Sequence, residues 1–363
     1  MTQENSSTIT ELVLVGFSNY PQAETPLFFL FSLIYLVNLF GNTVIFILVV
    51  IDSCLQTPMY FFLCHLAFLN IFYTTAVVPK MLFNLLASKK VISYEFCLAQ
   101  TYISLLMGAA ECIILAIMAL DRYVAICYPL RYLIIMNWSV CMQLAGGAWA
   151  ISFFASVVPL YFTTVPICGP YIIDHIFCEV PVLLNMICDD TSLQETLMII
   201  GASGTLLLPF LLIVLSYLCI LVSVMSMHTA ESRKKAYSTC SSHLTVVTIY
   251  YGTGMFMYMR PKSLYSAKGD KLISLFYAVI NPALNPLIYS LRNKKVQGAV
   301  RRTLERFRES SRLLPVLLGT GGEADPEVRI NTIFGLDMLA EHGSLPSQEH
   351  FSQLLELLLP LLA

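Results

Sequence analysis

The chain has 363 residues, of which 57% are hydrophobic and only 12% are charged, and its formal net charge at pH 7 is -2. Soluble globular domains carry about 25% charged residues, so the composition indicates a chain whose solvent is a lipid bilayer. The charge balance gives no sign of nucleic-acid binding, and eleven cysteines are too few for a small disulfide scaffold.

The N-terminal segment, residues 1–26, is polar and contains no Lys or Arg, so it lacks the basic start of a cleavable signal peptide. Asn5 opens an Asn-Ser-Ser triplet, which is an acceptor for N-glycosylation on the lumenal side of a membrane. We therefore expect residues 1–26 to be extracellular and the first apolar run to act as the insertion signal.

Seven apolar runs follow, each long enough to cross about 30 Å of hydrocarbon. They lie near 27–51, 59–82, 96–121, 141–163, 195–226, 237–259 and 272–291. Each run is about twice the length that a membrane β-strand needs, so each predicts a helix. The expected fold is all-α, with a seven-helix transmembrane bundle over residues 27–291. The excess of Lys and Arg on one side favours an extracellular N-terminus.

In that orientation four cysteines face an oxidising compartment, an even number suited to two disulfides. They are Cys97, Cys168, Cys178 and Cys188. Their positions alone allow three pairings, each of which would hold the long second outer loop over the bundle as a lid. His175 and Glu179 in that loop are too few ligands for a metal site, so loop packing is the better interpretation and no metal is expected.

Polar side chains at mid-membrane depth predict a small cluster inside the bundle. Glu111 is the one carboxylate there, and Asn42, Asn70 and Asn285 come from the first, second and seventh runs. Ionisable groups in spanning helices are functional candidates, although interhelical hydrogen bonding alone also explains such a cluster. A single carboxylate and the absence of repeated halves argue against a proton relay or a transporter.

Asp121 and Arg122 end the third run at the inner membrane face. Taken alone, this pair fits an interfacial anchor with a local ion pair as well as it fits a moving mechanism.

Several separate motifs, in order along residues 1–305, resemble those of the olfactory receptors, a branch of the rhodopsin-like G-protein-coupled receptors. They are Gly41-Asn42, TPMYFFL at 57–63, MALDRYVAIC at 118–127, PLRY at 129–132, SYLCI at 216–220, KAYSTCSSHL at 235–244 and NPLIYSLRN at 285–293. The resemblance implies a plasma-membrane receptor that binds a small odorant and activates a heterotrimeric G protein of the olfactory, cAMP-raising Gs type. It implies no enzyme activity and no cofactor.

The resemblance also implies individual roles. Arg122 would be held by Asp121 at rest, then released to meet Tyr217 and the C-terminal helix of a G-protein α subunit, while Tyr289 swings inward. The implied switch residues are Asp121, Arg122, Tyr123, Tyr217, His243, Asn285, Pro286 and Tyr289. The family's disulfides imply the pairs Cys97–Cys178 and Cys168–Cys188.

In this family the odorant site lies between the outer halves of helices 3, 5 and 6. The implied lining is Ser104, Leu105, Gly108, Ala202, Thr205, Tyr251, Met255 and Tyr258. A mostly apolar lining with a few hydroxyls suits an alcohol, aldehyde, ketone or ester of modest polarity. The chain departs from the family at Asn70, where Asp is usual, which leaves Glu111 as the one carboxylate where a sodium site needs two.

The C-terminal part has two predicted segments. Residues 292–312 form a basic amphipathic pattern, with an apolar stripe of Val296, Val300, Leu304 and Phe307, that suits a helix lying on anionic membrane lipids. Residues 313–363 resemble one HEAT repeat of an importin-β-type nuclear transport receptor, a helical tail that cannot bury its apolar face alone. Two alternatives follow from this tail: a non-signalling chimaeric membrane protein retained in the endoplasmic reticulum and, less favoured, an importin-like adaptor.

Overall fold

The computed structural model describes residues 11–161, 171–184, 186–187, 190–226, 229–259, 267–291, 293 and 295–305. The chain divides into two units. The larger comprises Met1–Phe46 and Gln56–Asn293, and the smaller comprises Ile47–Leu55 and Lys294–Ala363.

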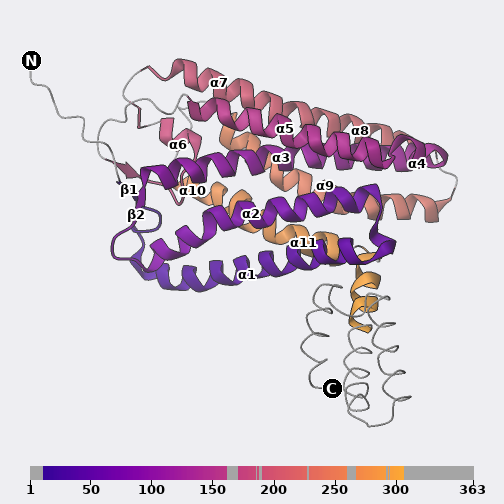
Figure 1. Ribbon diagram of the computed structural model, residues 1–363, viewed down its shortest axis with the longest axis horizontal. Coiled ribbons are helices and arrows are strands. Elements are labelled where there is room, and N and C mark those ends of the chain that lie inside the picture. The colour runs from indigo at the N-terminus through magenta and orange to yellow at the C-terminus, as the bar shows by residue number, and fades with distance from the viewer. Residues whose placement is uncertain are drawn as a thin grey trace, which may run out of the picture. The chain divides into compact units, whose positions relative to one another are not determined.

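Seven long helical rods form most of the described part of the larger unit, which confirms the predicted seven-helix bundle (Figure 1). The single-helix rods are α1 (Pro21–Ile51), α2 (Pro58–Leu86), α3 (Tyr94–Cys127), α5 (Trp138–Tyr161) and α9 (Ala230–Tyr258). The other two are α7 (Ser192–Ala202) continued by α8 (Leu208–Met225), and α10 (Ala267–Leu275) continued by α11 (Asn281–Leu291). Short elements between them are α4 (Tyr132–Ile135) and α6 (Val180–Leu184).

The length and composition of the described rods fit membrane-spanning helices in all but one case. Six of them are long and apolar enough to cross a bilayer. The seventh described rod, α9, carries many hydroxyl residues and does not meet this criterion. The helix α3 is the centre of the packing, because it contacts α2, α5 and α8 along its length. The chain is therefore a multi-pass membrane protein.

Several helix boundaries differ from those expected. The first helix begins at Pro21 rather than near residue 27, and α3 continues to Cys127 rather than ending at Asp121. Hydropathy marks where a run is apolar, whereas a helix continues until its backbone hydrogen bonds stop. The consequence at α3 is that Asp121 and Arg122 lie within a helical segment and not after it.

Two rods contain a π-helical turn. Ser203–Leu207 joins α7 to α8, and Phe276–Ile280 joins α10 to α11. Such turns insert one extra residue into a helix and rotate the side chains that follow, and they are frequent at functional sites. Both turns contribute side chains to the cavity described below.

A three-stranded sheet at the N-terminal end of the bundle is an element that the all-α expectation missed. Its strands are β1 (Glu11–Leu14), β2 (Val91–Ser93) and β3 (Ile172–Ile173). The central strand β1 pairs antiparallel with β2, opposing Leu12 to Ile92, and parallel with β3, opposing Leu14 to Ile173. Strands of two to four residues are too short to give a readable alternation in sequence. The sheet joins residues 11–14 to the segment before α3 and to the segment after α5.

In the smaller unit, residues 295–305 are helical and connect to the loop after α1. Arg302 donates from Nε and Nη2 to Oδ2 of Asp52, at 3.1 and 2.8 Å, and Oδ1 of Asp52 accepts from the backbone N–H of Cys54. This loop–helix link was not predicted from the sequence, because its partners lie 250 residues apart.

Candidate functional site

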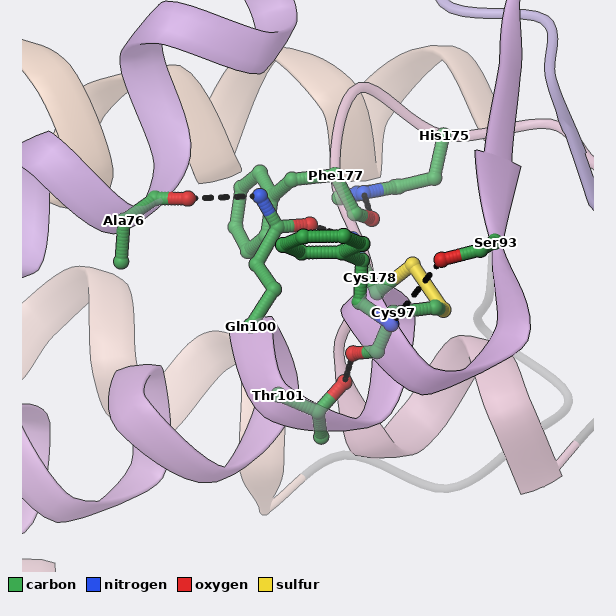
Figure 2. The surroundings of a disulfide bond; sticks show 9 residues. Ala76, Ser93, Cys97, Gln100, Thr101, His175, Phe177 and Cys178 are labelled. Carbon is green, nitrogen blue, oxygen red and sulfur yellow. Dashed lines mark hydrogen bonds between the residues drawn. A yellow bond between two sulfur atoms is a disulfide. The ribbon is translucent and has the colours of Figure 1, made fainter.

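A disulfide joins Cys97, in the first turn of α3, to Cys178 in the second outer loop (Figure 2). It is the pair that the family resemblance implied. Gln100, one turn along α3, supports the bond: its Nε2 donates to the carbonyl of Ala76 and its Oε1 accepts from the N–H of Cys178, both at 2.8 Å. The side chain of Gln100 therefore holds the loop backbone to α2 and α3 beside the covalent link.

The residue after Cys178, Glu179, is held in place by side chains from α10 and from the π-helical turn Phe276–Ile280. Glu179 accepts hydrogen bonds from the hydroxyls of Tyr277 and Ser274, and its Oε1 lies 3.2 Å from Nε2 of His175. The other nitrogen of His175 lies 3.0 Å from the carbonyl of Phe177. His175 and Glu179 are each 2% exposed, so these groups form a buried polar knot that closes one end of the bundle.

A mostly apolar cavity lies beneath this knot, between α3, the α7–α8 rod and α9. Its volume, counted as space open to the centre of a water-sized sphere, is about 100 Å³. Six of the eight positions expected to line an odorant site do line it: Ser104, Leu105, Gly108, Ala202, Thr205 and Tyr258. Further lining residues come from helices that the expectation had left out, such as Tyr73 of α2, Ser156 of α5, Val180 of α6 and Tyr277 of the π turn.

Tyr251 and Met255 do not line the cavity, so these two expected positions require correction. The cavity face of α9 is formed instead by Tyr250, Gly254 and Tyr258, which are spaced four residues apart and so lie on one face of a helix. The hydroxyl of Tyr251 donates to the carbonyl of Cys112 at 2.7 Å, and the residue is 1% exposed. Two of the three expected positions on α9, Tyr251 and Met255, are therefore each one residue away from a residue that lines the cavity.

The hydroxyl of Ser104 is a free hydrogen-bonding group at the cavity. Ser104 is 9% exposed, and its Oγ has no hydrogen-bond partner among the residues that the structure describes. The hydroxyls of Thr205, Tyr250 and Ser156 also lie at the cavity, but they donate to the carbonyls of Gly201, Gly108 and Ser152 respectively. Ser104 is therefore the best placed of these groups to donate to a bound molecule.

The predicted polar cluster forms in the structure as a chain of side-chain amides. Nδ2 of Asn70 donates to Oδ1 of Asn42, and Nδ2 of Asn285 donates both to Oδ1 of Asn70 and to Oε1 of Glu111, each at 3.3 Å. All four residues are buried. Because Glu111 also lines the cavity, the cluster connects the ligand cavity to α11.

Close packing of α1 against α11 explains the glycine beside this cluster. A Cβ on Gly41 would lie 2.8 Å from the ring of Pro286, closer than real Cβ contacts come. Asn42 then donates from Nδ2 to the carbonyl of Pro282 at 3.2 Å, a carbonyl whose usual helical donor would be the nitrogen of Pro286. Gly41, Asn42 and Pro286 therefore act together to hold the two helices in contact.

At the opposite end of the bundle, three helices meet at His243. The hydroxyl of Tyr217 on α8 lies 2.8 Å from Nδ1 of His243 on α9, and Nε2 of His243 lies 3.1 Å from the carbonyl of Leu115 on α3. A carbonyl can only accept, so Nε2 carries the hydrogen and Nδ1 accepts from Tyr217. The ring is 0% exposed and both nitrogens are paired.

Asp121 does not hold Arg122 in this structure, contrary to the role that the resemblance implied. Oδ1 of Asp121 accepts from the hydroxyl of Tyr132 on α4 at 2.7 Å, and no ion pair joins the two neighbours among the described salt bridges. Consecutive residues of a helix point about 100° apart, which separates the two side chains. Nε of Arg122 is buried and has no hydrogen-bond partner within the described part of the chain.

The other two switch tyrosines differ in environment. Tyr123 contacts Tyr128 edge to face, with ring centroids 5.7 Å apart. Tyr289 on α11 is 3% exposed, and its buried hydroxyl has no partner among the described residues. This end of the bundle thus combines one fully paired histidine with two buried polar atoms, Nε of Arg122 and the hydroxyl of Tyr289, that have no partner among the described residues.

Some expected positions lie outside the described residues. They are the glycosylation acceptor Asn5, the second pair Cys168 and Cys188, residues 306–312 of the predicted amphipathic segment with Phe307, and the C-terminal segment 313–363 with its HEAT-like pattern.

Comparison with known proteins gives one family. A family model described as "Olfactory receptor" matches residues 31–306. Human olfactory receptor 2A12 is 46% identical over 307 residues, covering 84% of this chain and 99% of that protein. Human olfactory receptors 13D1 and 10A7 are 45% and 44% identical, each over 84% of this chain, and the alignments cover 89% and 96% of those proteins.

Proposed function

Because the chain belongs to the olfactory receptor family, whose members are odorant-binding G-protein-coupled receptors and not enzymes, we propose a specific activity for it. A small, mostly apolar odorant binds in the cavity lined by Ser104 and Tyr258, and its binding activates a heterotrimeric G protein of the olfactory Gs type. The G protein binds at the end of the bundle that carries Arg122 and Tyr217.

The cavity supports the ligand class. Its lining is dominated by Ala, Gly, Leu, Met and Tyr side chains, which favour an apolar body. The free hydroxyl of Ser104 favours one hydrogen-bond acceptor on that body. No Lys or Arg is among the residues that line the cavity, so an ester, ketone, aldehyde or alcohol fits better than a carboxylate. The unpaired hydroxyl of Ser104 is the single observation that carries this assignment.

The His243 bridge supports the coupling to a G protein. It holds α8, α9 and α3 together at the inner end, where a G-protein helix would have to enter. Breaking it would free Tyr217, and Nε of Arg122 and the hydroxyl of Tyr289 are buried polar atoms without a partner among the described residues. A bundle that opens there gains partners for these groups, which is the property that a two-state switch requires.

The Cys97–Cys178 bond supports the orientation. Disulfides persist in oxidising compartments, so the end of the bundle that carries this bond and the sheet faces outward. β1 belongs to that end, which supports an extracellular N-terminus and a cytoplasmic position for Arg122. We propose the plasma membrane as the working location.

A panel of esters, ketones, aldehydes and alcohols, applied to cells with cAMP as the readout, tests the function. We expect at least one member to raise cAMP in cells that express the chain truncated after Ser310. Surface staining of the full and truncated chains runs in parallel. A truncated chain that reaches the surface while the full chain stays inside would favour endoplasmic-reticulum retention by the tail; a surface-expressed chain that responds to no oxygenated odorant contradicts the ligand class.

A further inference from the structure

The odorant cavity has a second polar end, deeper in the bundle than Ser104. Glu111 lies seven residues after Ser104 on α3, which places it on the same face of the helix and about 10 Å farther from the disulfide. Both residues line the cavity, as do Leu105 and Gly108 between them. The cavity therefore extends along α3 and has a polar residue toward each end.

Tyr73 of α2 brings a hydroxyl to the same depth. Asn285 donates to Oδ1 of Asn70 and to Oε1 of Glu111, so these two acceptors lie at one level of the bundle. Tyr73 lies three residues after Asn70, which is about 4.5 Å toward the outer end on the same face of α2. Tyr73 and Glu111 both line the cavity, and we call this pair the deep end.

The deep end has hydrogen-bonding capacity that the described chain does not use. Oε1 of Glu111 accepts from Asn285, whereas Oε2 accepts no hydrogen bond from the described residues. The hydroxyl of Tyr73 likewise makes none within the part of the chain that the structure describes. Tyr73 is 6% exposed and Glu111 is 3% exposed, and buried polar groups cost free energy unless they are hydrogen-bonded. A bound molecule can supply the missing partner.

The combination of a phenol and a carboxyl group selects the chemistry of that partner. A ligand hydroxyl can accept from the O–H of Tyr73 and donate to Oε2 of Glu111 at the same time. It also fits a protonated Glu111, because a hydroxyl oxygen accepts from a carboxylic acid. An ammonium group has no lone pair for Tyr73, and a carbonyl group has no hydrogen for a carboxylate. An alcohol therefore suits the deep end better than an amine or a second carbonyl.

The spacing between Ser104 and Glu111 sets the length of the ligand. An extended chain advances about 3.5 Å for every three bonds, so about 10 Å corresponds to about nine bonds. The free hydroxyl of Ser104 donates at the other end, where a carbonyl oxygen can accept.

We propose that the cavity selects an elongated odorant with two polar groups: a carbonyl oxygen that accepts from Ser104 and, about nine bonds away, a hydroxyl that bonds to Tyr73 and Glu111. This inference rests on the proposed function. It adds that the deep end determines specificity for a hydroxylated ligand.

Binding to the purified full chain in lipid nanodiscs tests the proposal without a G protein. The probe is undecan-2-one with a hydroxyl on its last carbon, whose two oxygen-bearing carbons are about nine bonds apart, and undecan-2-one itself is the matched ligand. We expect the hydroxyl to lower the Kd about five- to tenfold, measured by ligand-induced thermal stabilisation. Homologues about three bonds shorter should gain about twofold or less, because they cannot reach both ends.

Three variants test the deep end through the ratio of the two Kd values. Tyr73→Phe removes a hydroxyl that makes no hydrogen bond within the described chain, and it should lower the ratio about threefold. Tyr250→Phe is the matched control and should keep the full ratio, because that hydroxyl already donates to the carbonyl of Gly108. Glu111→Gln should keep most of the ratio, because glutamine still accepts from Asn285 and offers an N–H to the ligand.

The outcomes separate this inference from the proposed function. Equal Kd values for the two ligands on the unmodified chain, the same ratio at every chain length, or binding of neither ligand would each overturn the two-ended site, while shorter odorants could still raise cAMP. Equal ratios in Tyr73→Phe and Tyr250→Phe would overturn the role of Tyr73. Tight binding of the hydroxy ketone without a rise in cAMP would support the site and contradict the coupling to a G protein.

Discussion

The hydroxyl of Tyr217 lies 2.8 Å from Nδ1 of His243, and the same imidazole reaches the carbonyl of Leu115 through Nε2. A single buried ring thus connects α8, α9 and α3 at the end of the bundle opposite the disulfide. Both of its nitrogens are satisfied only while these three helices stay in place, so the bridge favours the closed inner end.

Replacing His243 by Phe should raise signalling in the absence of odorant. The change keeps an aromatic ring but removes both hydrogen bonds, and the loss of about 2 kcal/mol from the closed state shifts the closed-to-open ratio about 30-fold. The measurement is basal cAMP normalised to surface expression. Thr248→Val, which removes only a hydrogen bond to Leu244 on the same helix, is the control and should leave basal cAMP unchanged. Basal signalling that stays the same in His243→Phe would show that the bridge does not restrain the closed state.

Ser104→Ala should weaken the response to an oxygenated odorant. The hydroxyl has no partner among the described residues, so its removal costs the ligand a hydrogen bond and lowers potency about five- to tenfold. Thr205→Val is the matched control at the same cavity, because the threonine hydroxyl already donates to the carbonyl of Gly201. Equal losses in the two variants would show that Ser104 contributes shape and not a hydrogen bond.

Cys97→Ser should strongly reduce the amount of receptor at the cell surface. The bond closes a chain segment with a sequence separation of 81 residues, and removal of a native disulfide of this kind costs about 2–5 kcal/mol. Surface staining of intact cells measures the effect. Cys219→Ser, at an exposed free cysteine, should leave surface levels unchanged. Normal surface levels of Cys97→Ser would show that Gln100 and the outer sheet suffice to hold the loop.

Asp52→Asn should loosen helix 295–305. Burial alone raises the pKa of Asp52, but hydrogen bonds from Arg302 and Cys54 and the charge of Arg302 outweigh it, and the pKa falls below the ordinary 3.8. A lowered folded-state pKa means that the stabilisation is complete above the ordinary value and is lost only as pH falls through the lowered one. Amide-exchange protection of residues 295–305 should therefore be constant between about pH 7 and 5 in the unmodified chain and lower throughout in the variant.

The exposed pair Arg301–Glu305 on the same helix provides the comparison for that experiment. Glu305→Gln should change the protection very little, because exposed ion pairs of this kind are screened by solvent. A loss of protection as large as that of Asp52→Asn would mean that general charge, and not the buried link to Asp52, stabilises the helix.

The apolar runs made the seven-helix bundle predictable, because the requirement to cross hydrocarbon sets both the length and the composition of each helix. Contacts between helices were predictable only where a polar residue lies within an apolar run, as Asn42, Asn70 and Glu111 do. Two of the positions expected to line the cavity from α9 were wrong by one residue, because the hydroxyl-rich sequence of this helix gives little difference in polarity between its faces. The partner of Asp121, Tyr132, lies beyond the helix end, and nothing in the local pattern points to it.

His65 on α2 was not singled out from the sequence either. A lone histidine on an apolar helix is commonly a satisfied core residue, and only the structure shows that its Nδ1 is paired with the indole of Trp149. The disulfide pairing came from the family resemblance, because the positions of the four outer cysteines left three pairings open.

The central proposal is that Arg122 couples odorant binding to the G protein. Its buried Nε lacks a partner among the described residues, and we propose that the complex with the G protein supplies one. The most direct measurement is odorant-driven cAMP in the Arg122→Ala variant, with surface expression quantified on the same cells. The account predicts normal surface expression and loss of the cAMP response; a full response at normal surface expression would contradict it.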